Sequence, residues 1–262
     1  VKWIEDLREH LMATNNSREI SCELFSPSSK SAFVAESGAL LIVMFPVYAF
    51  NAPVIIDDFL LGLPFCADGV AAVIAVSGGG EVSPNTASRC RTKRLLKKKG
   101  FCTVYEAGLV MPSNLIIEYP ETISLLLLRI LPEKAARIAA DLSSGTVKGM
   151  KIHVIDRLWA RLGALEKCGS PSFGKRIKVS GACKGCGLCA AKCPRGNIVL
   201  ENGKPVFQDR CIMCLGCIYR CPRKALKPGI LKFFVFDDFD IDSLQKKLDA
   251  DFWESPDREK IK

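Results

Sequence analysis

The sequence predicts an α/β fold with a doubly wound parallel sheet, followed by a small cysteine-rich α+β domain. In the first half of the chain, apolar runs of strand length alternate with segments of helical pattern. That order is expected of a parallel sheet covered by helices. In the second half, eight of the 13 cysteines fall between Cys183 and Cys221, which sets this segment apart from the rest of the chain.

Continuous apolar runs mark two of the four predicted strands, Ala39–Phe45 and Val70–Val76, as is typical of strands buried on both faces. Pro53 falls in the first turn of one predicted helix, where proline is tolerated, and Pro132 is expected to kink or break another. The predicted strands are Glu19–Phe25, Ala39–Phe45, Val70–Val76 and Phe101–Val110. The predicted helices are Val1–Leu11, Ala52–Leu61, Asn85–Lys99 and Pro120–Leu142.

The rest of the chain divides into a connection, the cysteine-rich domain and an extension. An amphipathic piece, Ile152–Leu165, precedes a stretch rich in glycine and serine that ends at Gly174. An apolar run, Ile230–Phe236, and a predicted helix at Asp242–Leu248 follow the last cysteine. The predicted segments are an α/β domain over 1–144, a linker or connecting helix over 145–174, the cysteine-rich domain over 175–228 and a C-terminal extension over 229–262.

The composition is that of a globular protein with a substantial core. Hydrophobic residues make up 48% of the 262 residues, charged residues 25%, and the formal net charge is +9. The longest apolar runs, Ala39–Phe50 and Ile123–Leu128, are much shorter than the ~20 residues that span a bilayer. No signal-peptide pattern opens the chain. We therefore expect a cytoplasmic protein with no membrane span.

The cysteines form two copies of one motif, C-x₂-C-x₂-C-x₃-C-P. The first copy runs from Cys183 to Pro194 and the second from Cys211 to Pro222, so corresponding cysteines lie 28 residues apart. Three cysteines at intervals of three wrap a tight loop around one [4Fe–4S] cubane. So dense a segment in a larger chain without an export signal favours metal ligation over disulfides.

The fourth cysteine of each motif begins the next helix and points to the other cluster. Gly185, Gly187 and Gly216 let backbone N–H groups approach the sulfur atoms. Zinc is the alternative metal, but a zinc site seldom needs three such cysteines in a row, twice, each followed by x₃-C-P. The predicted ligands of cluster I are Cys183, Cys186, Cys189 and Cys221, and those of cluster II are Cys211, Cys214, Cys217 and Cys193.

This segment closely resembles the bacterial dicluster ferredoxins. All eight cysteines and both motif prolines are present, over about a fifth of the chain. Between the motifs, Ile198–Leu200 and Pro205–Phe207 flank an Asn-Gly pair, the typical signal of a two-residue hairpin turn. The resemblance implies two [4Fe–4S] clusters and one-electron transfer.

Two loops of the α/β domain, Phe45–Pro53 and Ser77–Gly80, follow buried strands, at the edge where a doubly wound sheet binds ligands. A flavodoxin holds the isoalloxazine ring of FMN in such loops, and the chain resembles a family of anaerobe proteins that fuse a flavodoxin-like domain to a dicluster ferredoxin. The resemblance implies that Tyr48 and Phe50 stack on or edge the ring. The alternative is that these aromatics pack the loop and the glycines only make a turn. The implied FMN-binding residues are Pro46, Tyr48, Phe50, Asn51, Ser77, Gly78, Gly79 and Gly80.

The first strand and phosphate loop of a flavodoxin have no counterpart ahead of Val1. We therefore expect weak FMN binding, because that loop holds the phosphate at a helix N-terminus. In the flavodoxin order 2-1-3-4-5, the last three predicted strands are expected to pair in parallel. The strand at Glu19–Phe25 is expected to be displaced, isolated or slid into the place of the first.

A basic helix, Arg89–Lys99, offers a docking site for an acidic redox partner; a solvated helix face is the alternative. We expect no nucleic-acid partner, because aromatic residues are not interleaved there. The predicted function is iron–sulfur electron transfer coupled to a flavodoxin-like module, with donor and acceptor proteins that the sequence does not identify. The alternatives are a flavin-dependent oxidoreductase acting on a small molecule, and a non-redox or sensor role for the clusters.

Overall fold

The computed structural model describes residues 9–11, 23–24, 26, 38–113, 118–232, 235–236 and 239–249. Its first part contains a parallel sheet of three strands in the order β1-β2-β3. Each strand coincides with a predicted one, and the expected parallel pairing is confirmed. The strands are β1 (Leu40–Pro46), β2 (Gly69–Ser77) and β3 (Phe101–Val110).

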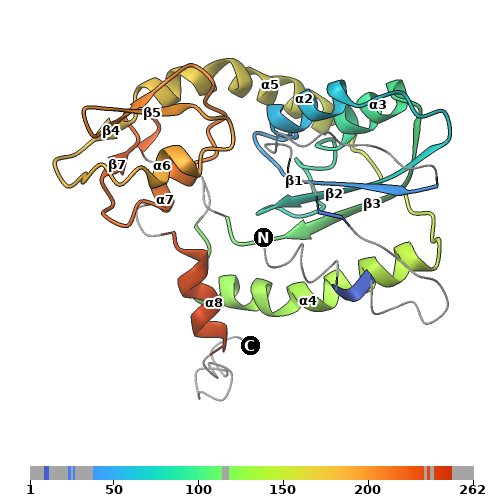
Figure 1. Cartoon of the computed structure of the whole chain (residues 1–262). Helices are drawn as coiled ribbons and strands as arrows, with labels where there is room; N and C mark the ends of the chain where they lie inside the picture. The colour runs from blue at the N-terminus through green and yellow to red at the C-terminus, as the bar shows by residue number, and fades with distance from the viewer. Residues whose placement is uncertain are drawn as a thin grey trace.

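Helices cover both faces of this sheet (Figure 1). They are α2 (Val54–Gly62), α3 (Cys90–Lys98) and α4 (Glu121–Ser143). α2 and α3 bury Leu60 and Leu96 against one face, and α4 buries Leu131 and Ile138 against the other. The α/β class is therefore confirmed. We call the part from β1 to α4 the sheet domain.

Two helices differ from their predicted form. α3 begins at Cys90 rather than Asn85, because the preceding segment is held by long-range bonds, such as that from the Thr86 N–H to the Asp156 carboxylate (3.1 Å). α4 continues through Pro132 without the expected break. Buried side chains on both sides of the proline, including Leu128 and Ala135, keep this helix packed in the core.

The predicted linker or connecting helix contains one long helix, α5 (Val154–Lys175). It passes through the glycine, serine and proline residues that predicted irregular chain. Inside it, Ser170 Oγ donates to the Glu166 carbonyl (2.8 Å). Its end is fixed by Phe173, which is buried in the core of the cysteine-rich domain. Tertiary contacts thus override the weak helix propensity of this stretch.

Other predicted segments are described only in part or lie further along the chain. Of the predicted helix Val1–Leu11, residues 9–11 are helical. Of the strand Glu19–Phe25, only residues 23 and 24 are described, and they lie in no strand, so its displacement stays a prediction. The C-terminal helix is confirmed as α8 (Ile241–Asp249). Within the described ranges, every helix is too short or too polar to cross a bilayer.

The cysteine-rich domain repeats one unit twice. β4 pairs with β7 and β5 with β6, both antiparallel. The β5–β6 pair is the predicted hairpin, and Asn202 and Gly203 both have positive φ at its turn. The elements are β4 (Lys178–Val179), α6 (Leu188–Ala191), β5 (Ile198–Glu201), β6 (Lys204–Phe207), α7 (Gly216–Tyr219) and β7 (Leu226–Lys227).

The repeat extends to the backbone conformation. Three positions of the first copy have positive φ, and so do the three positions 28 residues later. The first copy uses glycine at all three, whereas the second uses residues with side chains, for which the left-handed conformation costs roughly 1–2 kcal/mol. The pairs are Gly185 and Met213, Gly187 and Leu215, and Gly196 and Lys224.

The last pair predicts opposite effects of two substitutions. Gly196→Ala is expected to destabilise the domain by about 1 kcal/mol, because φ is 54° and open space surrounds the position, so only the backbone responds. Lys224→Gly is expected to stabilise it by about 0.5 kcal/mol, since the relieved strain exceeds the extra chain entropy of glycine. Anaerobic thermal unfolding of the cluster-loaded protein measures both. Shifts of the same sign would contradict this account.

Candidate metal centre

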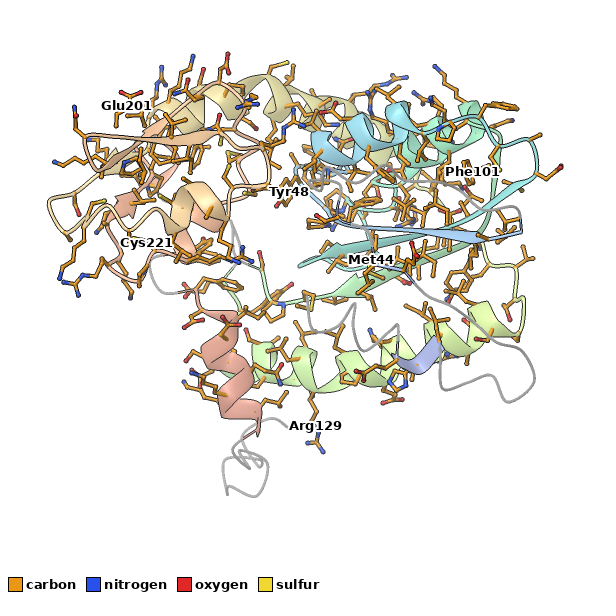
Figure 2. The ribbon with its side chains drawn as sticks, viewed as in Figure 1. Met44, Tyr48, Phe101, Arg129, Glu201 and Cys221 are labelled. Carbon is orange, nitrogen blue, oxygen red and sulfur yellow. The ribbon has the colours of Figure 1, made fainter. Side chains whose placement is uncertain are left out.

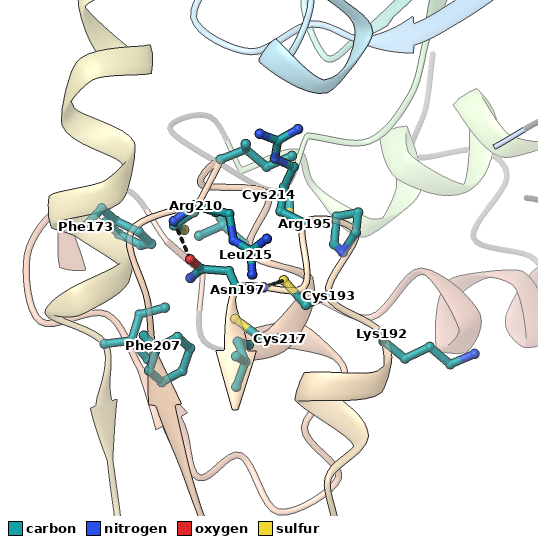
Figure 3. A pocket seen from close by; sticks show the side chains of 15 residues that line it. Phe173, Lys192, Cys193, Arg195, Asn197, Phe207, Arg210, Cys214, Leu215 and Cys217 are labelled. Atoms are coloured by element: carbon teal, nitrogen blue, oxygen red, sulfur yellow. Dashed lines mark hydrogen bonds between the residues drawn. The ribbon is translucent and has the colours of Figure 1, made fainter. Parts of the chain in front are cut away.

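Four cysteines from both motifs line one pocket. Cys211, Cys214 and Cys217 of the second motif lie there with Cys193 of the first (Figure 3). Burial, with smaller contributions from the neighbouring cysteines that include Cys193, raises the pKa of Cys217 to about 12. The Cys217 thiol must release its proton to bind iron. The pocket thus holds the four residues whose spacing predicts the ligands of cluster II.

The remaining cysteines of the first motif form a second group. Burial raises the pKa of Cys189, and the neighbouring Cys183 and Cys186 raise it further. Cys221, the fourth cysteine of the second motif, packs against the apolar core of this domain, as Cys189, Cys211 and Cys217 also do. The predicted ligands of cluster I are Cys183, Cys186, Cys189 and Cys221.

Backbone N–H groups donate to the sulfur atoms in a pattern that follows the repeat. The Asn197 N–H donates to Cys193 Sγ at 3.3 Å, and the Ala225 N–H, 28 residues later, donates to Cys221 Sγ at 3.3 Å. The Gly216 N–H bonds Cys214, as the sequence predicts for this glycine. Such donors stabilise electron-rich sulfur and thereby raise the reduction potential of a cluster.

The Asn197 side chain is completely buried beside this pocket. Its Oδ1 atom accepts the Arg210 N–H at 2.5 Å (Figure 3). This bond ties the end of the first motif to the residue just before Cys211. Asn197 therefore helps to hold the two motifs in register, as the predicted interleaved ligand sets would require.

No three Cys, His, Asp or Glu side chains among the described residues converge in the manner of a single-ion site. A cubane does not require such convergence, because its four thiolates bind four separate iron atoms. The chemistry of the donor set, eight thiols of which four line one pocket, with N–H donors around the sulfur atoms, fits two such clusters.

The sheet domain faces this centre with the carboxyl ends of its strands (Figure 1). Tyr48 follows β1 and lies between the two domains (Figure 2). Burial raises the pKa of its phenol above the usual value, and the neighbouring Cys214 and Glu166 raise it further. Arg195 forms an ion pair with Asp58 of α2 (2.7 Å). The surroundings of the predicted cluster II therefore contact the sheet domain through Arg195, and Tyr48 lies near Cys214.

The loop implied to hold flavin after β1 is a tight turn that packs on α5. Phe50 contacts Trp159, with ring centroids 5.9 Å apart, and Asn51 Nδ2 donates to the Ala160 carbonyl (2.7 Å). A side chain at Gly163 would collide with the Ala49 carbonyl. Pro46 ends β1 opposite Val76. In this structure, Phe50 and Asn51 make the loop-packing contacts of the alternative interpretation, and Tyr48 faces the cysteine-rich domain.

The second implied loop, Ser77 to Gly80, also makes contacts within the chain. Ser77 Oγ donates to the Gly80 carbonyl (3.2 Å), and the Gly78 carbonyl accepts the Tyr119 hydroxyl (2.5 Å). A side chain at Gly79 would collide with Asn85. The glycines are therefore needed for close packing of this turn.

The basic segment Arg89–Lys99 offers fewer free charges for docking an acidic partner than its sequence predicts. Arg89 is buried and pairs with Glu106 (3.2 Å), which Lys93 also contacts (2.5 Å). Arg91 pairs with Asp57 of α2 (2.8 Å). Much of this charge thus supports the fold, and the exposed basic residues outside these pairs are Arg94, Lys97 and Lys98.

A cavity of about 830 Å³ lies beside the predicted cluster I. Cys221 lines it together with Ser113 and Tyr119 of the sheet domain and with residues of α8. Tyr219 and Phe239 form an aromatic pair in its wall, with centroids 5.5 Å apart. The volume falls within the range of small-molecule sites.

Sequence reasoning missed the buried carboxylates that hold the helices in place. Asp156 is completely buried and accepts bonds from Ser83 Oγ (2.6 Å), Thr86 N–H (3.1 Å) and Thr86 Oγ1 (2.5 Å). Burial opposes ionisation of Asp156, but these bonds outweigh it and lower its pKa. The only hint in the sequence is an acidic residue inside an apolar helical pattern, which also occurs at exposed positions.

Comparison with known proteins bears on the cysteine-rich domain. Residues 182–226 match the family model of the 4Fe-4S dicluster domain. A stretch of 63 residues is 36% identical to a component of the ion-translocating oxidoreductase complex of Methanosarcina acetivorans, and covers 23% of this chain and 24% of that protein. The match thus spans about a quarter of this relative's length. No solved structure matches the chain.

These matches show a ferredoxin-type domain of the kind that carries 4Fe–4S clusters, and they support iron–sulfur electron transfer. The family model does not reach the sheet domain. Its α/β architecture rests on the parallel sheet and the two helical layers alone.

Proposed function

We propose that this chain is an electron carrier with two [4Fe–4S] clusters whose ligand sets are interleaved between the two motifs. The observation that carries the proposal is the pocket that Cys193 shares with Cys211, Cys214 and Cys217. The clusters supply one-electron transfer. The chain supplies the thiolates, the N–H donors around them and an apolar shell that limits water, with Phe173, Ile177 and Leu226 in its core.

Metal content and reduction test this proposal. Anaerobic reconstitution is expected to load about eight irons and eight sulfides per chain, four of each per cubane. Both clusters are expected to be reduced and reoxidised without unfolding. A native protein that holds zinc and no iron would overturn the proposal. If the clusters could be reduced only when the protein unfolds, their role would be structural.

The finer proposal is that a flavin at the carboxyl edge of the sheet exchanges electrons with cluster II. Three features support it: this edge faces the cysteine-rich domain, Tyr48 lies beside Cys214, and Asp58 pairs with Arg195. A flavin lets a protein interconvert one- and two-electron chemistry. Tyr48 would contact the ring, while Phe50 holds the turn against α5.

Titration with FMN and riboflavin, followed by flavin fluorescence, tests the flavin site. Tyr48→Ala is expected to weaken binding of both by about tenfold, because one aromatic contact is lost. Leu200→Ala, at an exposed position of β5, serves as the control and should change nothing. If Tyr48→Ala and the unmodified chain bound flavin with equal affinity, the flavin site would not lie at this edge of the sheet.

The cavity beside Cys221 favours a second function, reduction of a small molecule near cluster I. Its volume and aromatic wall suit a planar substrate. Turnover with a low-potential donor is compared between the unmodified chain and Ser243→Trp, which places an indole ring in this cavity and narrows it. The substitution should abolish turnover while both clusters remain reducible. Unchanged turnover would exclude this cavity as the substrate site.

A further inference from the structure

Helix α5 presents an apolar stripe to solvent. Six large apolar side chains are between 45% and 80% exposed. They recur at helical spacing over about three turns, so they share one arc of the helix. Monomeric proteins rarely expose an apolar patch of this length without using it. The stripe consists of Val154, Ile155, Leu158, Trp159, Leu162 and Leu165.

Positive charge borders this stripe. Arg157 and Arg161 are exposed on the same helix. Between Val154 and Cys168, all of which the structure describes, one of the two acidic residues is buried and the other is only partly exposed. Asp156 is completely buried and Glu166 is bonded to Ser170. The exposed surface of this stretch is therefore apolar and cationic.

The positive charge continues across the neighbouring helices. Asp57 of α2 bonds both Lys167 of α5 and Arg91 of α3, so the three helices form one layer (Figure 1). α3 turns Leu95 and Leu96 toward the sheet. Its other exposed basic residues therefore lie on the outer side of the layer, and they are Arg94, Lys97 and Lys98.

We propose that this outer face, made of the α5 stripe with its arginines and these three basic residues of α3, docks on an anionic lipid surface. An apolar arc with a large aromatic residue and flanking arginines is the pattern of a helix that lies in the membrane interface. Trp159 occupies one side of the arc, and tryptophan suits the boundary between acyl chains and headgroups.

Charge distinguishes a lipid surface from a second copy of the chain. Two copies that met through this face would bring arginines and lysines of like charge together, which is unfavourable. Anionic headgroups complement the same charges and add about 1 kcal/mol per basic residue near the surface. The proposal uses no cluster ligand or flavin contact, so its outcome is separate from that of the proposed function.

Sedimentation of the cluster-loaded protein with vesicles tests the proposal. Binding is expected to mixed vesicles of phosphatidylglycerol and phosphatidylcholine, and to weaken strongly on phosphatidylcholine alone or at high salt. Arg157→Gln with Arg161→Gln should lower the partition coefficient about 25-fold, or about fivefold for each charge. Leu158→Ser with Leu162→Ser should lower it at least about tenfold, since apolar contacts are lost.

The matched control is Val199→Ser with Leu200→Ser, which changes two exposed apolar residues of the cysteine-rich domain. It should bind as the unmodified chain does. Trp159 is left intact because it packs on Phe50. The proposal is overturned if no vesicle binds at low salt, or if the α5 and control variants bind alike. It is also overturned if the unmodified chain is a dimer that the α5 substitutions make monomeric.

Discussion

Cys193→Ala is expected to disrupt the cluster held by the second motif and to leave the cluster of its own motif intact. The reason is that Cys193 shares its pocket with Cys211, Cys214 and Cys217, so its thiolate completes their set. Loss of one of four ligands exposes an iron and makes the cubane labile. Iron content is expected to fall from about eight toward about four per chain.

Spectral matching identifies which cluster is lost. The residual electron paramagnetic resonance spectrum of reduced Cys193→Ala should match that of Cys214→Ala, and Cys221→Ala should match Cys186→Ala. Cys168→Ala, an exposed cysteine of α5 outside both motifs, is the control and should retain both clusters. If Cys193→Ala instead matched Cys186→Ala, each motif would hold its own cluster and the interleaved assignment would be wrong.

Asp156→Ala is expected to destabilise the protein by about 3–5 kcal/mol. The carboxylate is completely buried, and its removal leaves the Thr86 N–H and the hydroxyls of Thr86 and Ser83 without their acceptor. Urea denaturation measures the loss through Trp159, after Trp3 and Trp253 are replaced by Phe. Asp68→Ala, at an exposed position, is the control and should stay within about 0.5 kcal/mol.

The same carboxylate gives stability an acid dependence of known sign. The pKa of Asp156 lies below its usual value of 3.8. Its contribution is therefore complete above the unfolded pKa and is lost as the pH falls through the folded one. Asp156→Asn cannot ionise, so its stability should fall less steeply below about pH 4. If the free energy of unfolding fell equally steeply with decreasing pH for both proteins, the carboxylate would not be ionised in the folded state.

Local rules predict the elements whose partners lie nearby in the chain. The β5–β6 hairpin follows from Asn202-Gly203, which adopts positive φ at both turn positions. Two of the three strands, β1 and β2, follow from continuous apolar runs, because helices cover both faces of the sheet. β3 also carries Thr103 and Glu106, so its sequence signal is weaker. The offset of 28 residues between the motifs recurs in the positions of α6 and α7.

Prediction is incomplete where long-range contacts decide the conformation. The chain at Gly169–Gly174 has weak helix propensity, yet α5 continues through it because Phe173 is buried in the cysteine-rich domain. The start of α3 moves to Cys90 because the Thr86 N–H is bound by Asp156, 70 residues away. Charge patterns likewise do not reveal that Arg89 is buried against Glu106.

The candidate site also has one part that the local sequence predicts and one part that long-range contacts decide. The sequence by itself predicts the cysteine ligands and their grouping, because a cubane demands fixed spacing within one short segment. It does not determine what Tyr48 and Phe50 contact. The tertiary structure decides that Phe50 packs on Trp159 and that Tyr48 lies beside Cys214. These contacts depend on where α5 places the two domains, and that placement arises from the packing of residues that are far apart in the chain.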